Sequence, residues 1–102
     1  MRYVLVLQWP GSSEADFDAL IHMEDRLSQA LGDHASIDGH DFGSGEMNIF
    51  IETDHPTKAF SDAMATFGDG PRWAEVRAAF RDSTGDEYTI LWPQGLNAFS
   101  VK

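Results

Sequence analysis

Apolar side chains fill both alternating faces of the segment 3–9, YVLVLQW, with Gln8 as its polar position. A strand with one solvated face alternates apolar and polar residues, whereas a strand buried on both faces carries a continuous apolar run. The pattern therefore predicts a central β-strand. Pro10 and Gly11 then turn the chain.

A helical period follows this turn. Ser13 and Asp16 have the spacing of a capping box and Gly32 is a typical stop signal, which together predict one helix. At about 100° per residue, one helix face collects the apolar side chains Phe17, Leu20, Met23, Leu27 and Leu31. Glu24 falls inside this apolar arc and is expected to point toward the core, while Arg26 lies on the far, solvated side.

Two further strands, at about 35–42 and 47–53, flank the turn Gly43-Ser44-Gly45-Glu46 and predict a β-hairpin. A loop of two or four residues gives the pairs Phe42 with Met47, Asp41 with Asn48, His40 with Ile49 and Asp38 with Ile51. The face with Asp38 and His40 is the more apolar one and is expected under the helices. The other face carries Ile37, Asp41, Asn48, Phe50 and Glu52. A three-residue loop would exchange the two faces.

The second half of the chain predicts another helix and a closing strand. Asp54-His55-Pro56 opens a helix whose apolar stripe is Ala59, Phe60, Ala63, Met64 and Phe67. The stretch from Gly68 to Pro71 interrupts it, and a helical pattern resumes as far as about Arg81. Residues 88–92, YTILW, read as the last strand, and residues 93–102 form a tail.

The element order β-α-β-β-α-β predicts an α+β, ferredoxin-like domain that spans residues 1–102. Its four-stranded antiparallel sheet has helices on one face, and its second helix is broken near Gly68-Pro71. The uncovered sheet face retains apolar residues from the first and last strands, so we expect a second copy of the chain to cover it. The compatible alternative is that the tail, with Phe99 and Val101, folds back over part of that face.

The composition narrows the possible partners. Seven basic against seventeen acidic residues give a formal net charge of -10, which repels nucleic acid and anionic lipid and suits a basic protein partner. The chain has no cysteine, which excludes thiolate nucleophiles, zinc–thiolate sites and iron–sulfur clusters and is compatible with a cytoplasmic location. We see no signal peptide or membrane span, and we expect no cofactor.

Two groups of polar residues are candidates for a site. Glu24, Asp38 and His40 could be ligands of a metal ion, Glu24 could act as an acid–base group, or Glu24 or Asp38 could form a structural hydrogen-bonded pair with His40. On the other hairpin face, Asp41, Asn48 and Glu52 surround Phe50 as a solvated strand face or as a contact for a partner or ligand.

The layout of YVLVLQWPGSSEADFDAL as strand, turn and helix, with YTILWP as closing strand, resembles the dimeric α+β barrel superfamily of small ferredoxin-like proteins. Its members include antibiotic-biosynthesis-type monooxygenases and stress-responsive small-ligand proteins. The resemblance covers topology and length, and none of the superfamily's catalytic residues matches a position here. It implies a dimer whose sheets face each other around a cavity, here lined by Trp9, Phe50 and Trp92.

Three functions follow from these observations. The first is a non-catalytic association module, either a homodimer or an acidic partner of another protein. The second is a dimeric small-molecule enzyme or ligand binder of the α+β barrel kind. The third is an immunity-type inhibitor that presents its acidic residues to a basic partner.

Overall fold

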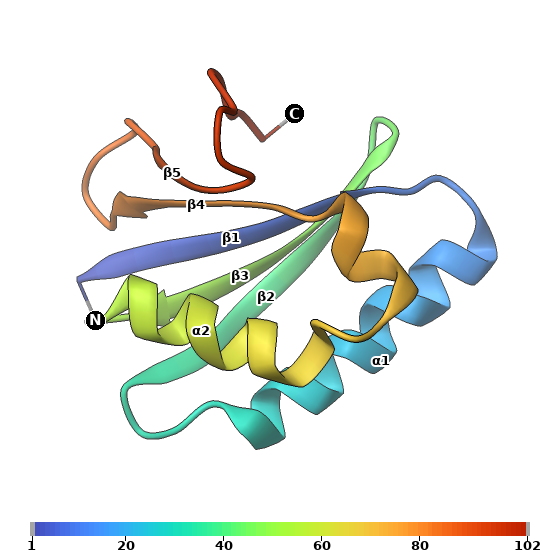
Figure 1. The fold of residues 1–102 in the computed structure, drawn as a ribbon, viewed down its shortest axis with the longest axis horizontal. Helices are drawn as coiled ribbons and strands as arrows, with labels where there is room; N and C mark the ends of the chain where they lie inside the picture. Colours follow the sequence, from blue (N-terminus) through green and yellow to red (C-terminus); the bar gives the residue numbers. More distant parts are fainter. Residues whose placement is uncertain (1, 102) are drawn as a thin grey trace.

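The structure, a computed structural model, describes residues 2–101 and places them in an α+β fold. Within these residues five strands form one antiparallel sheet in the order β2-β3-β1-β4-β5, and two α-helices pack on one of its faces (Figure 1). The elements are β1 (Tyr3–Pro10), α1 (Glu14–Ala30), β2 (Ala35–Gly43), β3 (Glu46–Thr53), α2 (Pro56–Phe67), the 3-10 turn η1 (Pro71–Glu75), β4 (Arg77–Asp82) and β5 (Thr89–Trp92). Neither helix of this part of the chain is long and apolar enough to cross a membrane.

β1 is the central strand that its apolar run predicts. It pairs with β3 along one edge and with β4 along the other, and residues 4–9 are all buried. Leu5, Leu7 and Trp9 point toward the helices and join the main hydrophobic core. Val4, Val6 and Gln8 therefore alternate onto the opposite sheet face, which we call the outer face.

The helix α1 confirms its predicted start. The Ser13 hydroxyl oxygen accepts a hydrogen bond from the Asp16 backbone N–H at 3.0 Å, and the Asp16 carboxylate accepts one from the Ser13 backbone N–H at 3.1 Å. This reciprocal pair satisfies two N–H groups that have no partner within the helix. Leu20, Met23 and Leu27 are buried as predicted, while Phe17 at the edge of the stripe stays 38% exposed.

The prediction of a helix over residues 71–81 was wrong. Only Pro71–Glu75 form a helical turn, of the 3-10 type, and Arg77–Asp82 form β4 along the second edge of β1. The helical spacing of Trp73, Val76 and Phe80 competes with a strand alternation that puts Ala78 and Ala79 on opposite faces, and a short apolar run does not decide between the two. The sheet consequently has five strands instead of four, and β5 extends it beyond β4.

The hairpin is confirmed over most of its length. Ser44 and Gly45 form a two-residue turn with φ of 56° and 80°, and three of the predicted pairs are present, including His40 with Ile49. A β-bulge between Ile37 and Gly39 then shifts the register, so the predicted pairing of Asp38 with Ile51 was wrong. Ile37 takes the place opposite Ile51, on the helix side, because the bulge adds one residue to β2.

The segment after β5 lies against the outer face, on the side of the sheet away from the helices (Figure 1). The Gln8 side-chain amide donates a hydrogen bond to the Ser100 carbonyl oxygen at 3.0 Å, and the Tyr88 and Phe99 rings lie 4.9 Å apart. Val6 and Ala79, both on this face, are fully buried. The tail thus covers part of the face for which the sequence predicted a cover.

Candidate functional site

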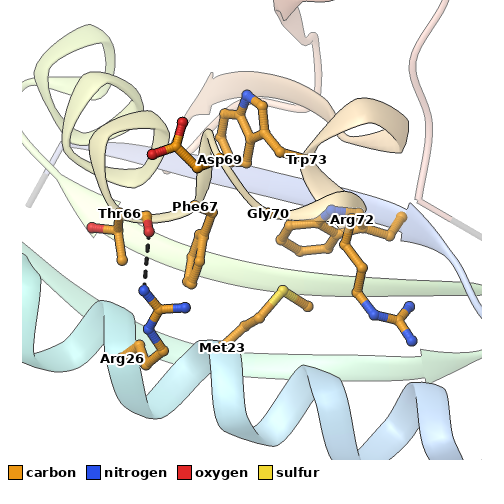
Figure 2. A pocket seen from close by; sticks show the side chains of 9 residues that line it. Met23, Arg26, Thr66, Phe67, Asp69, Gly70, Arg72 and Trp73 are labelled. Atoms are coloured by element: carbon orange, nitrogen blue, oxygen red, sulfur yellow. Dashed lines mark hydrogen bonds between the residues drawn. The ribbon is translucent and has the colours of Figure 1, made fainter.

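A pocket of about 490 Å³ lies between α1, the end of α2, η1 and β1 (Figure 2). Its lining consists of Trp9, Met23, Arg26, Thr66, Phe67, Asp69, Gly70, Arg72 and Trp73. A hollow of equal volume beside the β4–β5 loop is lined in part by Asp82, Asp86 and Glu87, which are at the surface. The first pocket differs because its floor is apolar and buried, as in most small-molecule sites.

Four apolar side chains from four elements form this floor. Trp9 at the end of β1 is 2% exposed, and Met23, Phe67 and Trp73 are each less than a tenth exposed. Trp73 stacks on Phe60 with ring centroids 5.7 Å apart and lies 6.4 Å from Phe67. The break after α2 therefore serves the pocket, because it lets Trp73 fold back over the helix that precedes it.

The indole nitrogen of Trp9 is the unusual group in this floor. It is buried and has no hydrogen-bond partner within residues 2–101. An unpaired buried donor costs about 1–3 kcal/mol, so natural structures pair such groups with protein, water or ligand. Trp9 lines the pocket, and its indole N–H is a buried donor without a partner among the described residues.

Two arginines flank the pocket on its α1 side (Figure 2). Arg26 donates to the Thr66 carbonyl oxygen at 3.1 Å, and its guanidinium lies 5.0 Å from the centre of the Phe67 ring. Arg72 contacts the Asp16 carboxylate at 2.9 Å. These are two of the seven basic residues in a chain of formal charge -10, so the pocket has an unusual share of the positive charge.

The Asp16 carboxylate holds Arg72 in place. Hydrogen bonds from the backbone N–H groups of Ser12 and Ser13, together with the Arg72 guanidinium, lower the pKa of Asp16 well below its ordinary value. Asp16 therefore stays ionised at any physiological pH, and the helix cap and the pocket share one charged group.

The aromatic residues predicted to line a common cavity are separated by the sheet. Trp9 lies in the pocket floor and Trp92 packs near Phe60, at 6.4 Å between ring centroids, so both are on the helix side. Phe50 pairs across from Val6 on the outer face. The structure therefore brings Trp9 together with Trp73 and Phe67 instead of with Phe50.

Of the first polar group, the structure brings two members together. His40 Nδ1 lies 2.9 Å from a Glu24 carboxylate oxygen, and both side chains are partly exposed. The bulge leaves Asp38 exposed and without a pairing partner on β3, and no group of three His, Asp or Glu residues in the described chain is arranged to hold a metal ion. The geometry matches the structural hydrogen-bonded pair among the three interpretations.

In the second polar group, around Phe50, one residue is buried and the others are partly exposed. Asn48 is fully buried in a cluster with Gln8 and Glu46, in which the Asn48 amide donates to Glu46 Oε2 at 3.1 Å and its oxygen accepts from Gln8 at 2.9 Å. Asp41, Phe50 and Glu52 remain partly exposed on the outer face of β2 and β3, and we call these three residues the outer strip.

The residues that complete the pocket were not recognised as a site from the sequence. Arg26 was expected to be solvated, and Phe67 and Met23 were expected to be ordinary core residues. Arg72 and Asp69 belong to a segment predicted as a helix break and a continued helix. The usable signal was the Gly-rich break between Phe67 and Trp73, which allows two aromatic side chains to meet.

Comparisons of the chain with protein-family models, with curated proteins and with solved structures gave no match. The assignment of the site therefore rests on its geometry.

Proposed function

We propose that this protein binds a small molecule in the pocket between α1, α2 and η1. The observation that carries the proposal is a pocket of about 490 Å³ whose floor consists of buried aromatic side chains, among them Trp9 with its unpaired indole nitrogen. Ligand pockets are typically about 300–1,000 Å³, with apolar walls and a few polar groups that orient the ligand. This pocket has that composition, with rings from three elements and two guanidinium groups at its edge.

We further infer that the first four strands and the two helices form a ferredoxin-like core, which β5 extends. Support comes from the order β1-α1-β2-β3-α2-β4 and from the arrangement β2-β3-β1-β4 within the sheet. A dimer of the α+β barrel kind remains a separate proposal, and residues 93–101 would have to form part of its interface because Ser100 already contacts Gln8. The cytoplasmic location stays a prediction.

Binding is tested with N-phenyl-1-naphthylamine, a neutral aromatic probe that fluoresces in apolar surroundings. We expect saturable binding to the folded protein, and loss of binding in Thr66→Phe, which puts a ring at the pocket edge. Ala65→Phe is the matched control, since Ala65 is the preceding residue of α2 and is exposed. The proposal is wrong if the wild type does not bind the probe or if Thr66→Phe binds it equally well.

A second candidate function is association through the outer strip. Phe50 is partly exposed and lies opposite Gly39, beside which a Cβ atom would meet nothing within 4 Å. Asp41 and Glu52 flank this ring, so two copies of the strip would repel each other and a basic protein surface would fit better. An inhibitor of a basic partner, of the immunity type, would use this strip.

Light scattering after size exclusion separates the two forms of association. A dimer that Phe50→Asp converts to a monomer would support self-association, and a monomer at all concentrations would overturn it. Capture of a basic partner should weaken steeply between low and high salt and in the Asp41→Asn, Glu52→Gln double variant. Capture that is insensitive to both salt and these substitutions would argue against the outer strip.

A further inference from the structure

We propose that the ligand of this pocket is a planar apolar molecule with one anionic group, a carboxylate or a sulfonate, that binds at Arg26. The inference rests on the proposed function and specifies the chemistry of that same site.

The first step is the direction of the hydrogen bonds that the pocket can make. The guanidinium groups of Arg26 and Arg72 can only donate. The hydroxyl of Thr66 already donates to the Asp62 carbonyl oxygen at 2.8 Å, so toward a ligand it can only accept. A ligand that pairs with the two guanidinium groups must therefore present acceptors, and a ligand rich in donors would leave their N–H groups unpaired.

The second step is the distribution of charge. Arg72 is paired with Asp16 at 2.9 Å, and the lowered pKa of Asp16 keeps this pair ionised, so Arg72 adds N–H groups but little net charge. Arg26 contacts a neutral carbonyl oxygen and an aromatic face instead. Its positive charge is not neutralised by these two contacts, and only one of its five N–H groups is used by Thr66.

The third step is the preorganisation of Arg26. Its hydrogen bond to Thr66 and its position over the Phe67 ring fix the plane of the guanidinium next to the apolar floor. A planar fork held in this way binds a carboxylate or sulfonate through two parallel N–H contacts. The floor of Trp9, Phe67 and Trp73 would contact the apolar body of the same molecule.

Asp69 is the one acidic side chain that lines the pocket, and it works against an anion. It is exposed, and Figure 2 shows it on the Trp73 side, away from Arg26 and Met23. Arg26 is exposed as well, so water and salt screen both side chains, and Asp69 lowers the attraction of the pocket for an anion. Asp69→Asn should consequently strengthen the binding of an anion, which gives a test with the opposite sign from removal of Arg26.

The experiment compares two probes that share a ring system. 8-Anilinonaphthalene-1-sulfonate carries a sulfonate, and N-phenyl-1-naphthylamine is the same molecule without it. Arg26→Gln should weaken binding of the sulfonate probe by about three- to tenfold and leave the neutral probe unchanged. Asp69→Asn should strengthen binding of the sulfonate probe by about two- to threefold. Arg77→Gln is the charge-matched control, because Arg77 is exposed and pairs opposite Gln8 on the outer face.

The outcomes separate the two proposals. If neither probe binds the wild type, the proposed function fails and this inference fails with it. If both probes bind but Arg26→Gln and Asp69→Asn leave the sulfonate probe unaffected, the pocket stands and the anionic ligand is excluded. An equal loss in Arg77→Gln would show a general effect of net charge and would also overturn the inference. Thermal melts establish that each variant folds, and Asp69→Asn alone decides the sign if Arg26→Gln does not fold.

Discussion

Replacement of Gln8 by alanine tests how strongly the buried polar cluster holds the tail against the sheet. The Gln8 amide nitrogen lies 3.0 Å from Glu46 Oε2, 2.9 Å from Asn48 Oδ1 and 3.0 Å from the Ser100 carbonyl oxygen. An amide has two N–H hydrogens, so two of these three acceptors are fully served at one time. The substitution removes about one bond to a charged group and one to a neutral group.

The expected loss follows from these two bonds. A neutral hydrogen bond contributes about 0.5–1.5 kcal/mol and one to a charged group about 1.5–3 kcal/mol. Their sum is about 2–4.5 kcal/mol in the free energy of unfolding. A hollow of about 230 Å³ borders Gln8, Glu46 and Ser100, and water in it can replace part of the lost donor. We therefore expect a loss of about 2–3 kcal/mol, toward the lower end of that range.

Urea unfolding followed by tryptophan fluorescence measures this loss, with an unchanged slope as the sign of an unchanged denatured state. Limited proteolysis gives a second readout, because the tail should be cleaved faster in the variant. Gln94→Ala is the control: it removes the same side chain from an exposed position in the tail and should stay within about 0.5 kcal/mol. A loss below about 0.5 kcal/mol for Gln8→Ala, or unchanged cleavage, would refute the reasoning.

Three further predictions concern the fold. Gly68→Ala should lower the free energy of unfolding, measured in urea, by about 1–3 kcal/mol, because the added Cβ would lie 2.6 Å from a backbone carbonyl oxygen of the preceding helical turn. Gly43→Ala is the control, since a Cβ at Gly43 would have no atom within 4 Å, and equal effects of the two substitutions would contradict the steric argument. Because folding lowers the pKa of Asp16, the contribution of this carboxylate to stability is present above a pH of about 4 and is lost as the pH falls further. Asp16→Asn should therefore flatten the plot of unfolding free energy against pH between about pH 5 and 2. An unchanged plot would show that the pKa of Asp16 does not differ between the folded and unfolded states. His40→Ala should lower the free energy of unfolding by less than about 1 kcal/mol, as expected for loss of a partly exposed pair with Glu24. Added zinc should not shift the melting temperature of the wild type, and a zinc-dependent shift that is absent in the variant would support a metal site.

The parts of the fold that were predicted correctly are those with local signals. The capping box of α1 and the two-residue hairpin turn act within a few residues, and the apolar run of β1 reports burial on both faces. β4 was missed because Ala78, Ala79 and Phe80 satisfy either period, and the open edge of β1 decided between them. The bulge at Asp38 likewise depends on the pairing of whole strands, which no short segment encodes.

The candidate site was harder to predict because its residues come from separate elements. Arg26 is on the polar side of α1 when the helix is considered alone, and it becomes a pocket residue only when the end of α2 packs beside it. The same holds for Trp9, whose burial was predicted but whose unpaired N–H is a consequence of the neighbours that tertiary packing supplies. The helical period describes one element at a time and carries no information on contacts between side chains of different elements.

The tail contact also has a consequence for folding during synthesis. β1 is made before β4 and before Ser100, whose carbonyl oxygen accepts the hydrogen bond from Gln8. While those residues are still within the ribosome, one edge of β1 and the side-chain amide of Gln8 lack native partners, and the nascent chain cannot reach the native state. We therefore expect products that terminate before residue 77, which lack β4 and the tail, to be recognised by chaperones and proteases as unfolded.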